Sequence, residues 1–334
     1  MTVRYITAFI LALLFTTAFG RFYIPWLRKN TSGQGIKSEV EWHQSKSGTP
    51  TMGGIMFILA SLFVILTVGF EDMLNGKYMH LFVFLFALVF GAIGFLDDWE
   101  KLKKKQNLGL SAKAKFLLQL AAAVIFVFLM KKFGYITFDI YIPFINKYIS
   151  VPHWLYYIFS AFVIVGTVNA VNITDGVDGL CTGTSIPVFL FFVAVSYLAG
   201  KSYVDIGIFA SSIIGGLVGF LFFNFNPAKC FMGDTGSLFL GGAVVALAFS
   251  YDMPLILITL GIIYLAETMT DIIQISYFKL THGKRVFKMA PLHHHLELGG
   301  FTGHKWTEKE LFFLFSGISL LFSVISFLGI INKF

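Results

Sequence analysis

The chain has 334 residues, of which 57% are hydrophobic and 13% charged, and its formal net charge is +7. A soluble domain carries about 25% charged residues, so this composition excludes an ordinary soluble protein and indicates a lipid environment. The positive charge does not indicate nucleic-acid binding, because the basic residues gather in short loops beside apolar segments, as in membrane proteins. Two cysteines, Cys181 and Cys230, are too few for a disulfide framework or a thiolate metal site.

Ten apolar segments follow one another, and we expect each to cross the bilayer as a helix. The first, at 5–27, is too long for a signal-peptide core, and Arg28 and Lys29 follow it instead of a cleavage site. The ninth contains Glu267 and Asp271, which predicts that it is broken, tilted or extends beyond the bilayer. The other segments are 51–69, 79–96, 114–131, 153–171, 181–199, 205–223, 237–251 and 308–331, and the ninth is 254–278.

The fold class predicted is therefore an all-α integral membrane protein, with residues 1–334 forming a single polytopic domain, since no long polar stretch separates two halves. Between the fourth and fifth segments, residues 135–151 predict a small β-hairpin with Ile145 and Asn146 near its turn. No internal repeat is visible, which disfavours a transporter built from inverted repeats.

The orientation follows from the basic residues in alternate loops. Sixteen Lys and Arg residues fall on one side of the predicted membrane and seven on the other. Because cytoplasmic loops are enriched in Lys and Arg, the richer side is predicted to be cytoplasmic. Both termini then lie outside the cytoplasm, which agrees with an even number of spans.

The polar clusters all fall on the side predicted to be cytoplasmic. The first, Ser45 to Gly54, precedes the second span and is a flexible loop with a lysine, Lys46, that could contact phosphate. It does not match a Walker A motif, because Lys46 comes before the glycines. The second cluster, Asp97 and Asp98 at the end of the third span, is either a helix end reaching solvent or part of a Mg²⁺ site. Lysines follow it, including Lys101 and Lys113.

The third cluster, Asn169 to Gly179, lies between two apolar runs and contains no cation. Asp175 and Asp178 are three residues apart, so a helical turn would place them on one face. Gly176 permits close approach of the backbone to a ligand. These features indicate a binding loop.

The fourth cluster, Asn224 to Ser237, begins with Asn-x-Asn-Pro, which predicts a helix stop and turn. It continues through Phe231 to Gly-Asp-Thr-Gly-Ser around Asp234, just before the next helix. The second half is either an ordinary helix N-cap or a phosphate site at a helix N-terminus.

The fifth cluster holds three consecutive histidines, His293, His294 and His295. Consecutive residues point in different directions on a helix, so a three-histidine zinc site is disfavoured. Together, the carboxylates, amides and lysines at one membrane face predict an enzyme that uses Mg²⁺ and acts on phosphates and lipid.

The combined motifs resemble those of the polyprenyl-phosphate N-acetylhexosamine-1-phosphate transferases. Within that superfamily, Gly48 to Gly54 and Pro291 to Gly300 resemble the bacterial phospho-N-acetylmuramoyl-pentapeptide transferases. The resemblance runs from about residue 20 to the last span. It implies ten spans and transfer of phospho-N-acetylmuramoyl-pentapeptide from its UDP conjugate to undecaprenyl phosphate, yielding UMP. It also implies a multi-pass protein of the bacterial inner membrane, a cytoplasmic active site and a homodimer, with no nucleic-acid partner.

The resemblance also assigns roles to residues. Asp234 would ligate Mg²⁺, with Asp97 beside it as a second ligand, and Asp97 and Asp98 would lie near the lipid phosphate. His293, His294 and His295 would close the site from the last cytoplasmic loop, with His294 counted as catalytic. The expected substrate-binding residues are Lys46, Lys101, Lys113, Asn169, Asn172, Asp175, Gly176, Asp178, Asn224, Phe231, His293 and His295. Of these, the resemblance places Asp175, Gly176, Asp178, Asn224 and Phe231 along the uridine and diphosphate of the nucleotide, with Asn172 nearby.

Two mechanisms are compatible with these residues. The lipid phosphate attacks the β-phosphate directly while Asp97 helps to remove its proton, or an aspartate such as Asp234 or Asp97 forms a covalent intermediate. We favour direct attack, because a metal-bound carboxylate is a poor nucleophile. The alternative functions are a related transferase that uses UDP-N-acetylglucosamine, which the triple histidine disfavours, and an ion-coupled transporter, which the position of the acids at one membrane edge disfavours.

Overall fold

The computed structural model describes residues 1–30, 46–104 and 108–334. The described chain is mostly helical, because a backbone in lipid must satisfy its own N–H and C=O groups. The long helices are α1 (Thr2–Asn30), α4 (Met79–Lys104), α5 (Ala112–Lys132), α6 (His153–Ile173), α7 (Leu180–Ala199), α8 (Val204–Asn224), α9 (Gly233–Ser250), α11 (Ile262–Leu280) and α13 (Glu308–Ile330). The short ones are α2 (Gly54–Thr67), α3 (Phe70–Leu74), η2 (Lys201–Tyr203), η3 (Pro254–Ile256), α10 (Leu257–Leu260) and α12 (Leu292–Glu297).

Every predicted apolar segment overlaps a helix. In the described residues, eight helices are long and apolar enough to cross a membrane, and a bent pair would make a ninth. That pair is the segment expected to be broken: Pro254–Leu260 and Ile262–Leu280 meet at an angle of 81°. The remaining segment forms α2, which at 14 residues is shorter than the others. The multi-pass helical architecture is confirmed, and the total of ten spans stays a prediction.

Helix α9 lies at the centre of the bundle and positions one end of the site. Every residue from Thr235 to Ser250 is buried, and α9 contacts α2, α4, α6 and α7. The contact with α4 is close because Gly94 has no side chain. A Cβ at Gly94 would lie 2.0 Å from the backbone oxygen of Asp234. The glycine therefore lets the end of α4 and the start of α9 touch.

The segment before α2 and the segment before α9 pair through their backbones. The N–H of Gly53 donates to the carbonyl of Phe231 at 2.9 Å, and the N–H of Gly54 donates to that of Met232 at 3.0 Å. The N–H of Phe231 donates to the carbonyl of Pro50 at 2.9 Å. Non-helical backbone beside a membrane core needs such partners, and these bonds fix both loops next to the site.

The predicted hairpin is present. Strands β1 (Asp139–Ile142) and β2 (Lys147–Ser150) are antiparallel, with Asp139 opposite Ser150 and Ile142 opposite Lys147. Residues 143–146 make the turn, which confirms Ile145 and Asn146 near it. The turn packs against the C-terminal helix, since the N–H of Phe144 donates to the carbonyl of Gly329 at 2.7 Å.

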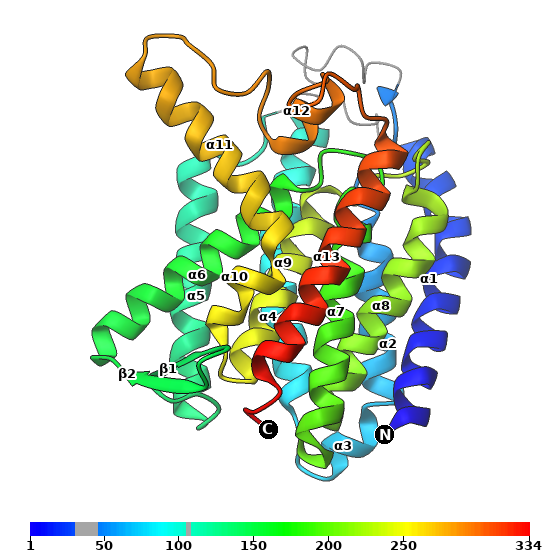
Figure 1. Ribbon diagram of the computed structural model, residues 1–334. Coiled ribbons are helices and arrows are strands. Elements are labelled where there is room, and N and C mark those ends of the chain that lie inside the picture. The colour runs from blue at the N-terminus through cyan, green and yellow to red at the C-terminus, as the bar shows by residue number, and fades with distance from the viewer. Residues whose placement is uncertain (31–45, 105–107) are drawn as a thin grey trace.

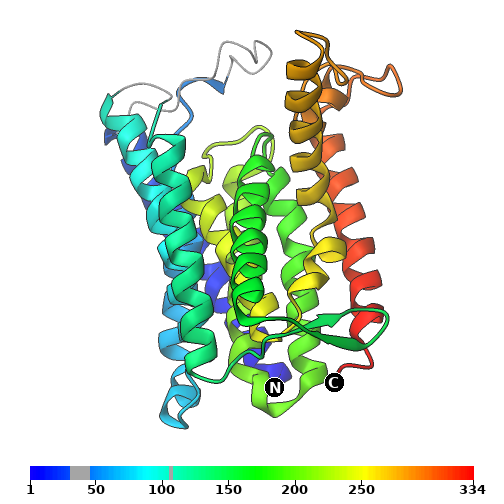
Figure 2. The ribbon, with the colours of Figure 1, turned by 90° about the vertical axis from the view of Figure 1, so that its left-hand side faces the viewer.

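Both termini and the hairpin lie at one end of the bundle, and α12 lies at the other (Figure 1). The perpendicular view shows the termini at the same end again (Figure 2). The two termini therefore share one end of the bundle, and their position outside the cytoplasm stays a prediction.

Candidate active site

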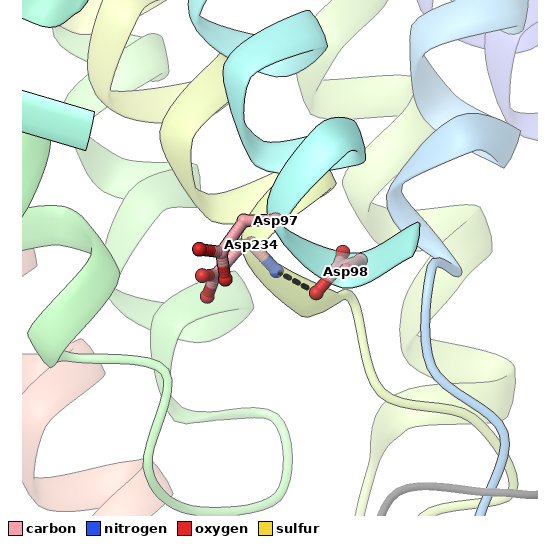
Figure 3. A group of neighbouring side chains, drawn as sticks. All are labelled: Asp97, Asp98 and Asp234. Carbon is pink, nitrogen blue, oxygen red and sulfur yellow. Dashed lines mark hydrogen bonds between the residues drawn. The ribbon is translucent and has the colours of Figure 1, made fainter. Parts of the chain in front are cut away.

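Three aspartates from two helices form the centre of the candidate site. Asp97 and Asp98 lie in the last turns of α4, and Asp234 lies in the first turn of α9 (Figure 3). One carboxylate oxygen from each lies within 4.8 Å of one from each of the others. Asp97 and Asp98 are buried, with exposed fractions of 4% and 2%. The structure therefore brings Asp234 next to a pair of acids of which the nearer in sequence, Asp98, precedes it by 136 positions.

Asp98 holds the start of α9. Its Oδ2 accepts hydrogen bonds from the N–H of Thr235 at 2.9 Å and the Thr235 hydroxyl at 2.7 Å, and its Oδ1 accepts from the N–H of Asp234 at 3.2 Å. The first N–H groups of a helix have no partner within the helix, and a carboxylate there also matches the helix dipole. Asp98 therefore acts as a cap supplied by another helix, and both its oxygens are engaged.

Two lysines neutralise the other acids. Lys101 Nζ lies 2.6 Å from Asp97 Oδ2 and 3.0 Å from Asp234 Oδ2. Lys115 Nζ, from α5, lies 2.7 Å from the same oxygen of Asp234. The Lys101 and Lys115 side chains are 21% and 17% exposed. Two partly buried ammonium groups beside a carboxylate site can also bind the oxygens of a phosphate.

From the sequence we expected Lys113 of α5 at the site, whereas the structure places Lys115 there. Lys113 is exposed, and no contact joins its side chain to the acids in the described residues. The two lysines are two residues apart on α5, about 200° around the helix axis. Only the orientation of α5 against α4 and α9 shows which one faces the site. A direct role for Lys113 with substrate stays a prediction.

The two asparagines of α6 have different partners, and one of them contacts the centre of the site. The amide of Asn172 donates to Asp234 Oδ1 at 2.9 Å and to the hydroxyl of Ser237 at 2.8 Å. The amide of Asn169, one turn earlier, donates to Gln119 Oε1 of α5 at 2.7 Å. Asn172 therefore orients a site acid, and Asn169 joins α6 to α5.

Asp178 forms a second cluster beside the first. Its Oδ1 accepts from Lys46 Nζ at 2.7 Å, and its Oδ2 accepts from the amide of Asn226 at 3.1 Å and the N–H of Ala228 at 2.8 Å. Lys46 also pairs with Glu308, the first residue of α13, whose carboxylate accepts from the N–H of Asp178 at 3.0 Å. Asp178 thus joins four segments. Glu308 was not anticipated, because no motif surrounds it.

The other residues predicted to bind the nucleotide lie near this cluster. Asn224 is buried, accepts from the Thr182 hydroxyl at 2.8 Å and donates to the carbonyl of Cys230 at 3.1 Å. Phe231 is half-buried and held by its backbone, as described above. Gly176 is exposed, at the turn between α6 and α7.

Asp175, beside Gly176, differs from the other acids. No hydrogen bond reaches its carboxylate in the part of the chain that the structure describes. Burial, and then the negative charges of Asp234, Asp98 and Asp178, raise its pKa well above the ordinary value. A carboxyl group in this position is available to a ligand rather than committed to the fold.

The three histidines point to three different partners, as expected for consecutive residues on a helix. His293 Nδ1 lies 3.0 Å from Glu267 Oε2, and His294 Nδ1 lies 2.7 Å from Glu297 Oε2. His295 Nδ1 accepts from the N–H of Lys288 at 3.0 Å. Each Nδ1 is thus engaged by a different group, and the sequence argument against a three-histidine metal site stays a prediction.

The donor set at the centre fits Mg²⁺. Mg²⁺ prefers carboxylate oxygens and is usually held by one or two carboxylates together with substrate phosphates. Asp97 and Asp234 are suited to this, since Asp98 is occupied by the N-terminus of α9. Asp97 and Asp234 would hold the ion, and Lys101 and Lys115 lie beside the same carboxylates, where a phosphate bound to the ion would meet them.

Comparison with known proteins identifies the family. A family model described as Glycosyl transferase family 4 matches residues 80–252, and a signature of phospho-N-acetylmuramoyl-pentapeptide-transferases matches residues 46–58. The chain is 42% identical over 324 residues to the phospho-N-acetylmuramoyl-pentapeptide-transferase of Listeria innocua, which covers 96% of both chains. It is 41% identical over 323 residues to that of Geobacillus thermodenitrificans, again with 96% of both chains covered. The chain belongs to the phospho-N-acetylmuramoyl-pentapeptide-transferase family.

The pentapeptide-transferase signature has a clear structural role in this chain. It begins at Lys46, which contacts Asp178 and Glu308, and it includes Gly53 and Gly54, whose N–H groups bond to the segment before α9. A Cβ at Gly54 would lie 2.2 Å from the Cα of Gly236. The signature therefore covers the residues that join the segment before α2 to the site.

Proposed function

We propose that this protein transfers phospho-N-acetylmuramoyl-pentapeptide from UDP-N-acetylmuramoyl-pentapeptide to undecaprenyl phosphate, producing UMP and the first lipid-linked intermediate of peptidoglycan synthesis. The observation that carries this proposal is the identity of about 42% to transferases of that name over nearly the whole chain. The acids, lysines and asparagines gathered at one end of the helical bundle supply a site for such a reaction.

The proposed reaction is a single displacement. An oxygen of the lipid phosphate forms a bond to the β-phosphorus, the anhydride bond to the α-phosphate breaks, and UMP leaves. Asp97 accepts the proton of the lipid phosphate, and Lys101 and Lys115 stabilise charge on the phosphates. Mg²⁺, held by Asp97 and Asp234, would neutralise the diphosphate and make UMP a better leaving group.

The hydrogen bonds favour direct attack over a covalent aspartate intermediate. Asp234 accepts from Asn172 at one oxygen and from Lys101 and Lys115 at the other. Asp97 accepts from the N–H of Leu110 at 2.9 Å and from Lys101. Carboxylates held in this way are poor nucleophiles toward phosphorus, whereas Asp97 can still accept a proton at a lone pair that Leu110 and Lys101 leave free. A sugar-phosphate adduct trapped on an aspartate in a single turnover would support the covalent route instead.

The proposal also includes the cellular setting. The site faces the cytoplasm of the bacterial inner membrane, where the UDP conjugate is available, and the lipid substrate reaches it from the bilayer. The excess of basic residues on that side supports this orientation. The homodimer implied by the family resemblance is part of the same proposal, and cross-linking in native membranes tests it.

UMP release tests the function. Purified protein in detergent is incubated with undecaprenyl phosphate, Mg²⁺ and either UDP-N-acetylmuramoyl-pentapeptide or UDP-N-acetylglucosamine. We expect UMP only with the muramoyl conjugate, and none after chelation of the metal. UMP release with the N-acetylglucosamine conjugate alone would reject the substrate assignment, and full activity in excess chelator would reject the Mg²⁺ requirement.

A further inference from the structure

Glu267 is a buried carboxylate to which the proposed reaction assigns no role. It lies in α11 with no exposed surface, and its Oε1 has no hydrogen-bond partner in the described residues. A charged group within a membrane-spanning helix is costly and is usually paired. Its partner is His293, whose Nδ1 lies 3.0 Å and whose backbone N lies 3.4 Å from Glu267 Oε2.

His293 in turn reaches the substrate loop. Its ring is 1% exposed, and a Cβ built on Gly176 would lie 2.3 Å from His293 Nε2. Nε2 is buried and has no hydrogen-bond partner in the described residues. Gly176 lies between Asp175 and Asp178, so the free ring nitrogen of His293 adjoins the loop assigned to the nucleotide.

The hydrogen bond to Glu267 determines which protons His293 carries. With Nδ1 donating to the carboxylate, Nδ1 is the protonated nitrogen in the neutral ring. Burial lowers the pKa of His293, but the charge and hydrogen bond of Glu267 outweigh burial and raise the pKa above its ordinary value. The imidazolium form, which carries a second N–H at Nε2, is therefore more populated at a given pH than in an isolated histidine.

The neighbouring histidines do not share this arrangement. His295 accepts from the N–H of Lys288 at Nδ1, and burial together with the charge of Lys288 lowers its pKa. His294 pairs with Glu297, three residues away on its own short helix. His293 is thus the member of the triplet that a spanning helix holds by a buried carboxylate.

We propose that Glu267 is a positioning residue that holds His293 protonated at both ring nitrogens, so that its Nε2–H donates a hydrogen bond to an anionic oxygen of the nucleotide diphosphate. This inference rests on the proposed function and assigns a purpose to the acid in the bent span. It also links that bend to the site, because α11 begins just after the break and carries Glu267 in its second turn.

The first test is Glu267→Gln in the full-length protein, assayed for UMP release across a range of pH. The amide fills the same space but removes the charge. We expect kcat/KM for the UDP conjugate to fall about 10- to 100-fold at neutral pH, as for other residues that orient a functional histidine. The basic limb of the pH profile should move to lower pH, so that activity recovers in part on acidification. The other titratable groups near His293 are Asp271 on α11, His294 and Glu297 on α12, and Asp175 on the facing loop.

Two further variants make the test specific. The double variant Glu267→Gln/His293→Asn should have the same kcat/KM as His293→Asn alone, because each change removes the same Glu267–His293 interaction. Glu71→Gln, the same chemical change on a side chain that is 73% exposed at the other end of the molecule, should leave activity unchanged.

The outcomes separate the two proposals. Loss of activity in Glu267→Gln by the same factor at every pH, with a lowered Tm, would show a purely structural role and overturn the inference, as would unchanged kcat/KM. If Glu267→Gln does not fold, Glu267→Asp keeps the charge on a shorter side chain. We expect Glu267→Asp to lower kcat/KM without moving the basic limb of the pH profile. Wild-type kinetics in this variant would overturn the inference. Absence of UMP release by the wild-type protein contradicts the proposed function instead.

Discussion

At Asp234 the two carboxylate oxygens are shared among three helices. Oδ1 accepts from Asn172 on α6, while Oδ2 accepts from Lys101 on α4 and Lys115 on α5. Asp98, by contrast, bonds only to the first residues of α9 among the hydrogen bonds of the described chain. Adjacent acids in one helix turn thus have separate tasks, with Asp98 maintaining the structure and Asp97 and Asp234 available for chemistry.

Replacement of Asp234 by Asn should abolish turnover. The amide cannot supply the negative oxygen that Mg²⁺ requires, and metal-based charge stabilisation contributes several kcal/mol to such reactions. A loss of about 1,000-fold in UMP release is expected, and the Tm should also fall, because Lys101 and Lys115 lose the carboxylate that they share. Near-normal release at saturating Mg²⁺ would remove Asp234 from the catalytic residues.

Replacement of Lys115 by Gln should reduce activity more than replacement of Lys113 by Gln. The Lys115 ammonium makes a charge-assisted bond to the site, and such bonds contribute about 1.5–3 kcal/mol, so kcat/KM should fall roughly 10- to 100-fold. Lys113 is exposed two residues earlier and is the matched comparison. Equal effects of the two variants on UMP release would contradict the assignment drawn from the orientation of α5.

Replacement of Asp175 by Asn should stabilise the protein while reducing its activity. Burial, Asp234 and Asp98 raise the pKa of Asp175, so folding opposes its ionisation. The wild-type protein is therefore destabilised by the ionisation of Asp175. This destabilisation is absent below the ordinary carboxyl pKa and grows as the pH rises through the raised pKa. The variant's Tm should exceed that of the wild type by a few degrees, about 2–4 °C per kcal/mol. This advantage should shrink as the pH is lowered.

A thermal-unfolding series at several pH values measures this difference directly. An advantage that stays constant down to acidic pH would show that ionisation of Asp175 is not its cause. A variant with both higher Tm and full UMP release would show that the loop tolerates the change, and Asp175 would lose its place in the site.

At the scale of elements, the junction of α4 and α9 holds the three aspartates Asp97, Asp98 and Asp234. Gly94→Ala inserts a Cβ that would lie 2.0 Å from the backbone oxygen of Asp234. Overpacking costs about 1–3 kcal/mol, and here the displaced atoms belong to the site. Both the Tm and UMP release should therefore fall.

Gly166→Ala is the matched control for this junction. Gly166 lies in α6, and a Cβ there meets no atom within 4 Å. Because Ala stabilises a helix interior relative to Gly, this variant should retain its Tm or gain slightly. If Gly94→Ala behaves like Gly166→Ala in both assays, α4 and α9 do not need the close contact.

The elements were largely predictable from the sequence, because apolar length determines where a helix can cross lipid. The hairpin turn near Asn146 followed from the pattern of residues around it. The position of the bend did not, since Gly261 is one of 32 glycines and the acids that suggested a break, Glu267 and Asp271, lie after it. The brevity of α2 also depends on its packing, which a hydropathy pattern does not contain.

Which residues contact one another within the site was less predictable from the sequence than which residues belong to it. Lys46 pairs with Glu308 across 262 positions, and Glu267 pairs with His293 from a different helix. Such pairings arise when the helices assemble, so no local pattern reports them. The acids were recognisable because charged residues are rare in an apolar chain, whereas a single glutamate at the start of a helix resembles an ordinary first-turn residue.

At the scale of the whole molecule, both termini and the hairpin share the end opposite α12. If the site faces the cytoplasm, a cysteine at the hairpin turn is outside. A membrane-impermeant maleimide should label Ile145→Cys in intact cells, since that residue is 61% exposed. It should label Lys305→Cys, an exposed position near α12, only after the cells are opened.

The native cysteines leave this measurement clear, because Cys181 and Cys230 are both buried. Labelling of Lys305→Cys in intact cells, with protection of Ile145→Cys, would reverse the proposed orientation and with it the cytoplasmic position of the site.

The ion pair of Glu308 has a consequence for biosynthesis. The ribosome makes α13 after the other described helices, yet its first residue contacts Lys46 and the loop of Asp178, which were made long before. Earlier helices can enter the membrane without it, but the cluster that joins four chain segments cannot close until α13 has been made and packed. We expect a chain truncated before α13 to enter the membrane with this cluster open.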